Sequence, residues 1–405
     1  MTGSAIVDAA GSGTGTAKEI SARAVLVALA MGGFAIGTTE FASMALLPNF
    51  ARDLGVSEAQ AADAISAYAL GVVAGAPLLA VAGARMRKRM LLIWLMVAFA
   101  IFNTLSAIAP TFGLFALSRF FSGLPHGAYF GVAAIVAASV VPRNKRASAV
   151  ARIFVGLTIA TTIGVPAASW LSAFIGWRAG YVIVGILALA TAVAVMLKAP
   201  RTPADPAANP LRELSALKNR QVLLTLATGA IGFGGFFAVY TYIASTVETT
   251  LGASDNAVAI MLAVAGIGMT IFNLLMGALA DKSLNRTAYV AFGGGTIVLA
   301  LFPVAVDTGL WTMGLVVLFM GMLGGVSTVM QARLMNVAGD AQQLAASLHH
   351  AAFNLANALG PFLAARAIAA GHDFPVSGYV GAALSALGFL MYAITLWDAR
   401  RSGIE

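Results

Sequence analysis

The chain is 405 residues long; 60% of its residues are hydrophobic, only 10% are charged, and its mean hydropathy is +0.89. This composition excludes an ordinary soluble globular domain and predicts a protein that crosses a membrane many times. The formal net charge is +8. The basic residues could bind a polyanion, or they could fix the orientation of the chain in the membrane. Because the chain has no cysteine, disulfides and thiol chemistry are excluded.

Apolar runs of about 20 residues, the length that crosses a bilayer, recur along the chain. They lack the alternation of polar and apolar residues that a transmembrane β-barrel needs. The expected fold class is therefore an all-α polytopic membrane protein with about twelve transmembrane helices. We place these spans at residues 23–47, 60–83, 89–109, 112–141, 149–174, 178–198, 221–246, 256–280, 286–305, 309–332, 343–369 and 375–397.

Lysine and arginine gather in the links on one side of the predicted membrane. These residues are Arg85, Arg87, Lys88, Arg89, Arg143, Lys145, Arg146, Lys198, Arg201, Arg212, Lys218, Arg220, Lys282, Arg286 and Arg333. The opposite links hold only Arg52 and Arg178 among basic residues, together with several acids. The positive-inside rule therefore predicts that both termini are cytoplasmic. The positive charge is then an orientation signal, and no nucleic-acid partner is expected.

Composition also divides the chain into parts. Residues 1–22 are small and polar and are expected to form a disordered cytoplasmic tail. The link at 199–220 is rich in proline and charge and separates two six-helix bundles, at 23–198 and 221–398, with a short cytoplasmic tail at 399–405. Weak similarity between the halves, as in "GGFAIGTTEF" and "GGFFAVYTYI", predicts a duplicated unit with a substrate site between its copies.

Glu40 and Arg119 are two charged residues that fall clearly within predicted spans, where a charge is costly and usually functional. At about 1.5 Å per residue, both are expected roughly 10–12 Å below the outer surface. In one interpretation Glu40 takes up and releases protons, and the guanidinium of Arg119 tunes its affinity. The alternatives are a static ion pair that fixes helix packing, or a glutamate solvated near the surface.

The fourth predicted span contains "SRFFSGLPHGAYFG", which combines polar, aromatic and small residues. One helical face carries Arg119, Ser122, His126 and Phe130. A ridge at four-residue spacing, suited to close helix approach, carries Gly123, Gly127 and Gly131. Pro125 is expected to kink the span, because it removes a backbone hydrogen bond. His126, near mid-membrane, either relays a proton or contacts substrate, or else is a neutral packing residue.

Other spans carry polar and aromatic side chains whose roles can each be interpreted in two ways. Amides line the cavity or join helices by hydrogen bonds: Asn103, Asn273, Asn354 and Asn357. Aromatic rings shape an amphipathic cavity or face lipid: Phe34, Tyr68, Tyr129, Phe236, Tyr240 and Tyr242. The neighbouring His349 and His350 point about 100° apart on a helix and lack a nearby carboxylate, so no metal site is expected.

Several motifs resemble those of a known family. They are "GTTEFASMALLPNFARDLGVS" at 37–57, "SRFFSGLPHGAYFGVAAIV" at 118–136, "GLTIATTIGVP" at 156–166 and "GALADKSLNR" at 277–286. With them the chain resembles the major facilitator superfamily and, within it, the drug and metabolite:proton antiporter group, most closely its arabinose-efflux-permease-like branch. The resemblance implies alternating access by two six-helix bundles, with the first, fourth, seventh and tenth spans lining a central cavity. No cofactor is expected.

The resemblance also assigns structural and gating residues. It implies that Asp281 and Arg286 hold the bundles together in one conformation. Residues expected to shape helices or their contacts are Gly123, Pro125, Gly127, Gly164, Pro166 and Pro361. Two motifs depart from the family pattern: the loop "GARMRKR" lacks the aspartate that Asp281 supplies in the second half, and Val165 separates Gly164 from Pro166.

The predicted function is secondary transport. No nucleotide-binding "GxxxxGK[ST]" occurs, so direct ATP drive is not expected. An intramembrane enzyme is a poor interpretation, because the histidines lack convergent acids. We expect proton-coupled efflux of a small organic molecule such as a sugar, nucleoside, purine or drug, by a monomer in the bacterial inner membrane. A symporter or facilitator of the same fold that imports its substrate is the alternative.

Overall fold

The computed structural model describes residues 21–56, 58–165, 167–168, 174–201 and 214–403. These residues are almost entirely helical and include no β-strand, as the apolar runs predicted. Several sequence predictions lie wholly or partly outside them: residues 1–20 of the tail predicted at 1–22, Pro166, residues 169–173 of the span predicted at 149–174, and most of the link at 199–220.

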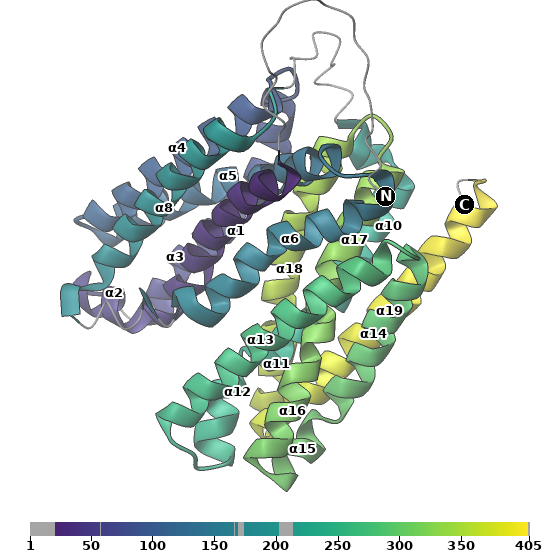
Figure 1. Ribbon diagram of the computed structural model, residues 1–405. Helices are drawn as coiled ribbons and strands as arrows, with labels where there is room; N and C mark the ends of the chain where they lie inside the picture. The colour runs from purple at the N-terminus through teal and green to yellow at the C-terminus, as the bar shows by residue number, and fades with distance from the viewer. Residues whose placement is uncertain (1–20, 57, 166, 169–173, 202–213, 404–405) are drawn as a thin grey trace, which may run out of the picture.

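The first half of the chain forms one group of helices, drawn from purple to teal in Figure 1. Its helices are α1 (Ala22–Ala45), α2 (Leu47–Asp53), α3 (Glu58–Ala82), α4 (Lys88–Ile108), α5 (Phe112–Ser139), the turn η1 (Arg143–Lys145), α6 (Arg146–Ile159) with the π-turn η2 (Ala160–Gly164), and α8 (Trp177–Lys198). α5 continues through Pro125 as one α-helix.

The second half forms a second group, drawn from teal to yellow (Figure 1). Its helices are the turn η3 (Leu214–Lys218), α10 (Arg220–Gly232), α11 (Gly234–Tyr240), α12 (Ile243–Ser245) with the π-turn η4 (Thr246–Thr250), α13 (Asp255–Ala280), α14 (Leu284–Ala300), α15 (Phe302–Thr308), α16 (Leu310–Met320), the turn η5 (Gly321–Leu323), α17 (Gly324–Val337), α18 (Gln342–Ala369), the turn η6 (Phe374–Val376) and α19 (Ser377–Arg401).

Every predicted span coincides with helical structure over most of its described residues, although not every span is one straight helix. Ten described stretches are long and apolar enough to cross a membrane, and the pair α14 and α15, bent by 41°, adds an eleventh. α18 supplies the remaining predicted span with 28 residues. It is not among the apolar stretches, because its glutamines, histidines and asparagines lower its hydropathy.

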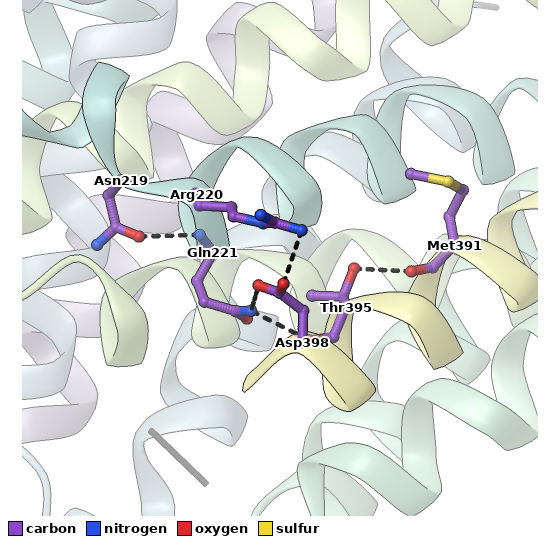
Figure 2. Close-up of polar contacts among 6 residues, drawn as sticks. All are labelled: Asn219, Arg220, Gln221, Met391, Thr395 and Asp398. Atoms are coloured by element: carbon purple, nitrogen blue, oxygen red, sulfur yellow. Dashed lines mark hydrogen bonds and ion pairs between the residues drawn. The ribbon is translucent and has the colours of Figure 1, made fainter. Parts of the chain in front are cut away.

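One residue that we placed near the membrane surface, Arg333, is buried in a helix instead. Arg333, predicted to lie in a basic link, is inside α17 and only 1% exposed, because α17 continues past the predicted end of the span. Its guanidinium donates to Gln221 Oε1 at 2.9 Å and lies over the ring of Tyr392. Figure 2 shows the adjoining cluster, in which Gln221 also donates to Asp398 at 2.9 Å. The basic-link assignment of Arg333 was therefore wrong.

The two groups of helices contact each other through α3 and α5 against α18, and through α6 against α13 and α17. Close polar contacts gather at the end where α1 begins and α19 ends. Lys88 Nζ donates to Gln343 Oε1 at 2.5 Å, and Gln343 Nε2 donates to the carbonyl of Ala80 at 2.9 Å. Toward the opposite end, which carries α2, α12 and α15, the ribbons diverge (Figure 1). The structure is thus closed at the terminal end.

Asp53 ties α2 to the start of α8 at that opposite end. Its carboxylate accepts a hydrogen bond from Trp177 Nε1 at 3.1 Å and pairs with the guanidinium of Arg178. These hydrogen bonds, led by that of Arg178, hold the pKa of the Asp53 carboxyl below its usual range.

Glycines let α3 and α5 approach closely. A Cβ at Gly123 would clash with the backbone carbonyl of Tyr68, and one at Gly71 would clash with the carbonyl of Phe120. Backbone atoms cannot move aside as a side chain can, so neither position tolerates a larger residue without shifting a helix.

We therefore expect Gly123→Ala to lower the free energy of unfolding by about 1–3 kcal/mol. The measurement is the apparent melting temperature of the purified protein in detergent. Gly113→Ala, in the first turn of the same helix, is the control, since a Cβ there meets nothing within 4 Å. Equal melting temperatures for both variants would show that the close approach does not limit stability.

Candidate functional site

The Arg119 guanidinium is the centre of a buried polar network in the first half of the chain. It is 1% exposed, and its Nη1 donates to Asn103 Oδ1 at 3.3 Å, to Thr39 Oγ1 at 3.1 Å and to Ser122 Oγ at 3.2 Å. Thr39 in turn donates to Asn103 Oδ1 at 2.7 Å. Uncharged side chains from α1, α4 and α5 therefore all accept hydrogen bonds from this one guanidinium.

Aromatic rings surround the same guanidinium. Its central carbon lies 4.4 Å from the ring centroid of Tyr68 on α3 and 5.2 Å from that of Tyr181 on α8. Such ring faces stabilise a desolvated cation. The Tyr181 hydroxyl is 3.0 Å from Ser43 Oγ, which connects α8 to α1.

Glu40 lies beside this network but is not hydrogen-bonded to it. The side chain is 3% exposed, and among the described residues neither carboxyl oxygen has a hydrogen-bond partner. Arg119 interacts with it electrostatically, yet no nitrogen–oxygen contact within 4.0 Å forms an ion pair. The structure therefore brings the two predicted charges into one region without locking them together, and the static ion pair of the alternative interpretation is not present.

Tyr68 connects the network to the second half of the chain. Its hydroxyl is 2.9 Å from His126 Nδ1, while Nε2 of His126 has no partner among the described residues. The ring centroid of His126 is 5.2 Å from that of His350 on α18. A continuous row of side chains thus leads from Arg119 through Tyr68 and His126 to the opposite half.

The two histidines of α18 have different surroundings. His350 stacks on Phe130, with ring centroids 4.2 Å apart and planes 14° apart, and neither ring nitrogen has a hydrogen-bond partner among the described residues. His349 Nε2 lies 2.8 Å from Ser327 Oγ. No group of three metal-ligating side chains occurs within the described part of the chain.

The remaining predicted cavity residues do not converge on Arg119. Asn273 joins three helices: it donates to the carbonyl of Ala151 on α6 at 2.8 Å and accepts from Thr328 on α17 at 2.5 Å. The Tyr129 hydroxyl donates to the carbonyl of Leu29 at 2.8 Å. Both are interhelical contacts; for Asn273 this is the simpler of the two interpretations that the sequence left open, and for Tyr129 it is neither of them.

Aromatic residues of the second half form a cluster of their own. Phe236 stacks on Tyr240 with centroids 5.4 Å apart, and Phe353 of α18 packs against the neighbouring ring of Phe233. Tyr242 is at the edge of this group and donates to the carbonyl of Pro361 at 3.4 Å. Asn354 bonds within its own helix, to the carbonyl of His350, and Asn357 is half-buried on α18.

Sequence reasoning did not select three residues of the network. Thr39 and Ser43 lie on α1 close to Glu40, so that scanning the polar neighbours of the acid would have found them. Tyr181 gave no signal, because an aromatic residue in an apolar span is equally common at a lipid-facing position. His350 was considered as a metal ligand, and that interpretation was rejected.

Two groups of membrane-spanning helices, the first of which holds a buried acid beside a buried cation, are typical of a membrane transporter. The chain belongs to the Major Facilitator Superfamily, whose family model matches residues 29–248 and 242–403. This confirms the family resemblance that the motifs indicated. It is accordingly a transporter and not an enzyme.

Relatives and solved structures agree with this assignment. The chain is 39% identical to the inner membrane transport protein YdhP of Escherichia coli K12, over 90% of this chain and 94% of that one. It is 32% identical to a chloramphenicol resistance protein of Streptomyces lividans, over 84% and 88% of the two chains, and 26% identical to a probable sugar efflux transporter of Pasteurella multocida, over 92% of each. The structure of the proton:xylose symporter XylE covers 91% of this chain and 94% of its own, with a TM-score of 0.70 and 17% identity.

These similarities support a location in a bacterial inner membrane, since the chain has spanning helices and a relative named for that membrane. The likeness to XylE concerns the fold alone.

The adjacent histidines of α18 provide a matched pair of substitutions. His350→Phe removes no hydrogen bond and preserves stacking on Phe130, so we expect an unchanged or higher melting temperature. His349→Phe leaves the Ser327 hydroxyl unpaired, which should cost about 1–3 kcal/mol. Thermal unfolding of both purified variants makes the comparison, and a larger loss for His350→Phe would contradict the assigned surroundings.

Proposed function

We propose that the protein is a proton-driven efflux carrier that works by alternating access, and that Glu40 is its proton-binding group. The observation that carries the proposal is the buried carboxyl group of Glu40, which lies beside a buried cation and has no hydrogen bond or ion pair with any residue that the structure describes. Intramembrane acids of this kind are typical of proton relays in transporters.

The surroundings of Arg119 suit a carboxyl group that changes its charge. The guanidinium donates to Thr39, Asn103 and Ser122, all of them neutral. Loss or gain of a proton at Glu40 therefore breaks no hydrogen bond of the network, while it changes the electrostatic interaction with Arg119. Coupling follows if substrate and proton bind the two conformations of the carrier differently.

His126 extends the proposed proton site toward the interface between the halves. Its Nε2 is unpartnered among the described residues and its Nδ1 contacts Tyr68, whose ring lies under Arg119. A change of charge near Arg119 can thus alter the contacts of His126 with His350 on α18, which belongs to the other half. This row of side chains is our proposed link between protonation and the movement of the halves.

The proposed topology places both termini in the cytoplasm, following the basic links. The closed end of the structure is then the cytoplasmic one. Asp281 contributes to this closure, because it accepts from the backbone nitrogens of Ala147 at 3.0 Å and Ser148 at 3.3 Å. An acid at the start of a helix also interacts favourably with the helix dipole. We propose a gating role for this contact, with Arg286 on the following helix.

The names of the relatives suggest which compounds to test first. One relative is a chloramphenicol resistance protein and another a probable sugar efflux transporter, so an amphipathic drug and a sugar are the proposed substrate classes. The symporter XylE has the same fold, and for this reason import remains the competing direction.

The test compares Glu40→Gln with Glu248→Gln, an exposed acid in the second half, in a bacterial host without its own efflux pumps. Export of chloramphenicol and of arabinose is measured with and without a protonophore. We expect the wild type and Glu248→Gln to export one of these probes until the protonophore is added. Glu40→Gln should fall to the level of cells that carry an empty vector.

Proteoliposomes then separate coupling from folding. The exported probe should drive proton movement across the membrane for the wild type and not for Glu40→Gln, while both proteins melt at similar temperatures. Full proton-driven exchange by Glu40→Gln in proteoliposomes would refute the coupling assignment. In the cell assay, accumulation of the probe by the wild type instead of its export would establish the importing direction.

A further inference from the structure

A cavity of about 630 Å³ opens on the side of the protein, between α1, α6 and α13. Its walls are apolar and include Val27, Met31, Ile159 and Leu274. Val27 is 56% exposed and Leu274 is 41% exposed, and both lie within membrane-spanning helices. Exposed apolar side chains at membrane depth face lipid, so the cavity is open to the acyl chains of the bilayer.

Two arginines complete the cavity. Arg23 lies in the first turn of α1 and Arg152 in the second turn of α6, so both are near the terminal end of the molecule. Both side chains are exposed, and among the described residues neither makes a hydrogen bond or an ion pair. Within the described part of the chain, no acidic residue lines the cavity. The result is a positively charged end on an otherwise apolar groove.

This combination matches an amphiphile with an anionic head. A phosphate group attracts the two guanidiniums, as basic residues at a membrane surface attract anionic lipid. The apolar walls offer nothing to a free inorganic anion but suit an acyl chain. Neither Glu40 nor any side chain that hydrogen-bonds to Arg119 lines the groove, so it is separate from the proposed proton site.

We propose that this groove is a binding site for an anionic phospholipid, with its phosphate between Arg23 and Arg152 and an acyl chain along Val27, Ile159 and Leu274. The site is shared by the two halves of the protein, because α1 and α6 belong to the first half and α13 to the second. A bound lipid therefore stabilises this arrangement of the halves. The proposal does not depend on the direction of transport or on proton coupling.

The test uses the full chain, purified in detergent and titrated with dioleoylphosphatidylglycerol or with dioleoylphosphatidylcholine, which has the same acyl chains and no net charge. Native mass spectrometry counts the bound lipids. We expect preferential retention of phosphatidylglycerol by the wild type. The double variant Arg23→Gln/Arg152→Gln should lose about tenfold in its apparent affinity for that lipid.

Two further variants make the test specific. Arg400→Gln removes an exposed charge from the terminal end outside the groove and should retain lipid as the wild type does. Val27→Trp keeps both arginines but fills the apolar wall, and should reduce retention as well. An excess of inorganic phosphate should not displace phosphatidylglycerol.

The proposal is overturned if the wild type retains both lipids equally, or if the double variant binds like Arg400→Gln. Displacement by inorganic phosphate would show instead that the arginines bind a free anion. The melting temperature of each variant shows that it is folded, so that loss of lipid is not mistaken for loss of structure.

Discussion

A guanidinium that is buried within a membrane protein must find acceptors among the helices that surround it, because the bilayer core supplies none. Arg119 meets this requirement with side chains from α1, α4 and α5 and with two tyrosine rings. The packing of the first half is organised around that need. The three hydrogen bonds of the guanidinium to neutral groups all come from Nη1, whereas Nε of Arg119, like the carboxyl group of Glu40, has no hydrogen-bond partner among the described residues.

The second half solves a similar problem in a different place. Arg333 is also buried, also lies over a tyrosine ring, and donates to the neutral side chain of Gln221. The carboxylate of Asp398 is connected through Gln221 and pairs with Arg220 at 2.8 Å (Figure 2). Here the acid has partners, whereas Glu40 has none among the described residues. The two halves thus differ, because the buried acid of the second half is paired, whereas the buried acid of the first half is the one to which we assign proton binding.

The sequence predicted the spans well, because apolar length is a local property that burial in a membrane demands. It also selected Glu40, Arg119, Ser122 and Asn103, since polar groups stand out in apolar helices. It could not select Tyr181, or separate Asn273 from the cavity residues, because those roles depend on which helices become neighbours. Arg333 was misplaced for the same reason. A basic residue near the end of a predicted span is assigned to the following link, and only the structure shows that the helix continues past it.

α18 has a consequence for how the protein is made. Its histidines, asparagines and glutamines make it the long helix that falls short of the hydropathy of a membrane span, and most of the contacts that bury it come from α3, α5, α10 and α11. Segments of low hydropathy partition poorly into a bilayer by themselves. The helix that joins the two halves therefore acquires its place in the membrane from helices synthesised before it, so that its insertion is itself a step of tertiary folding.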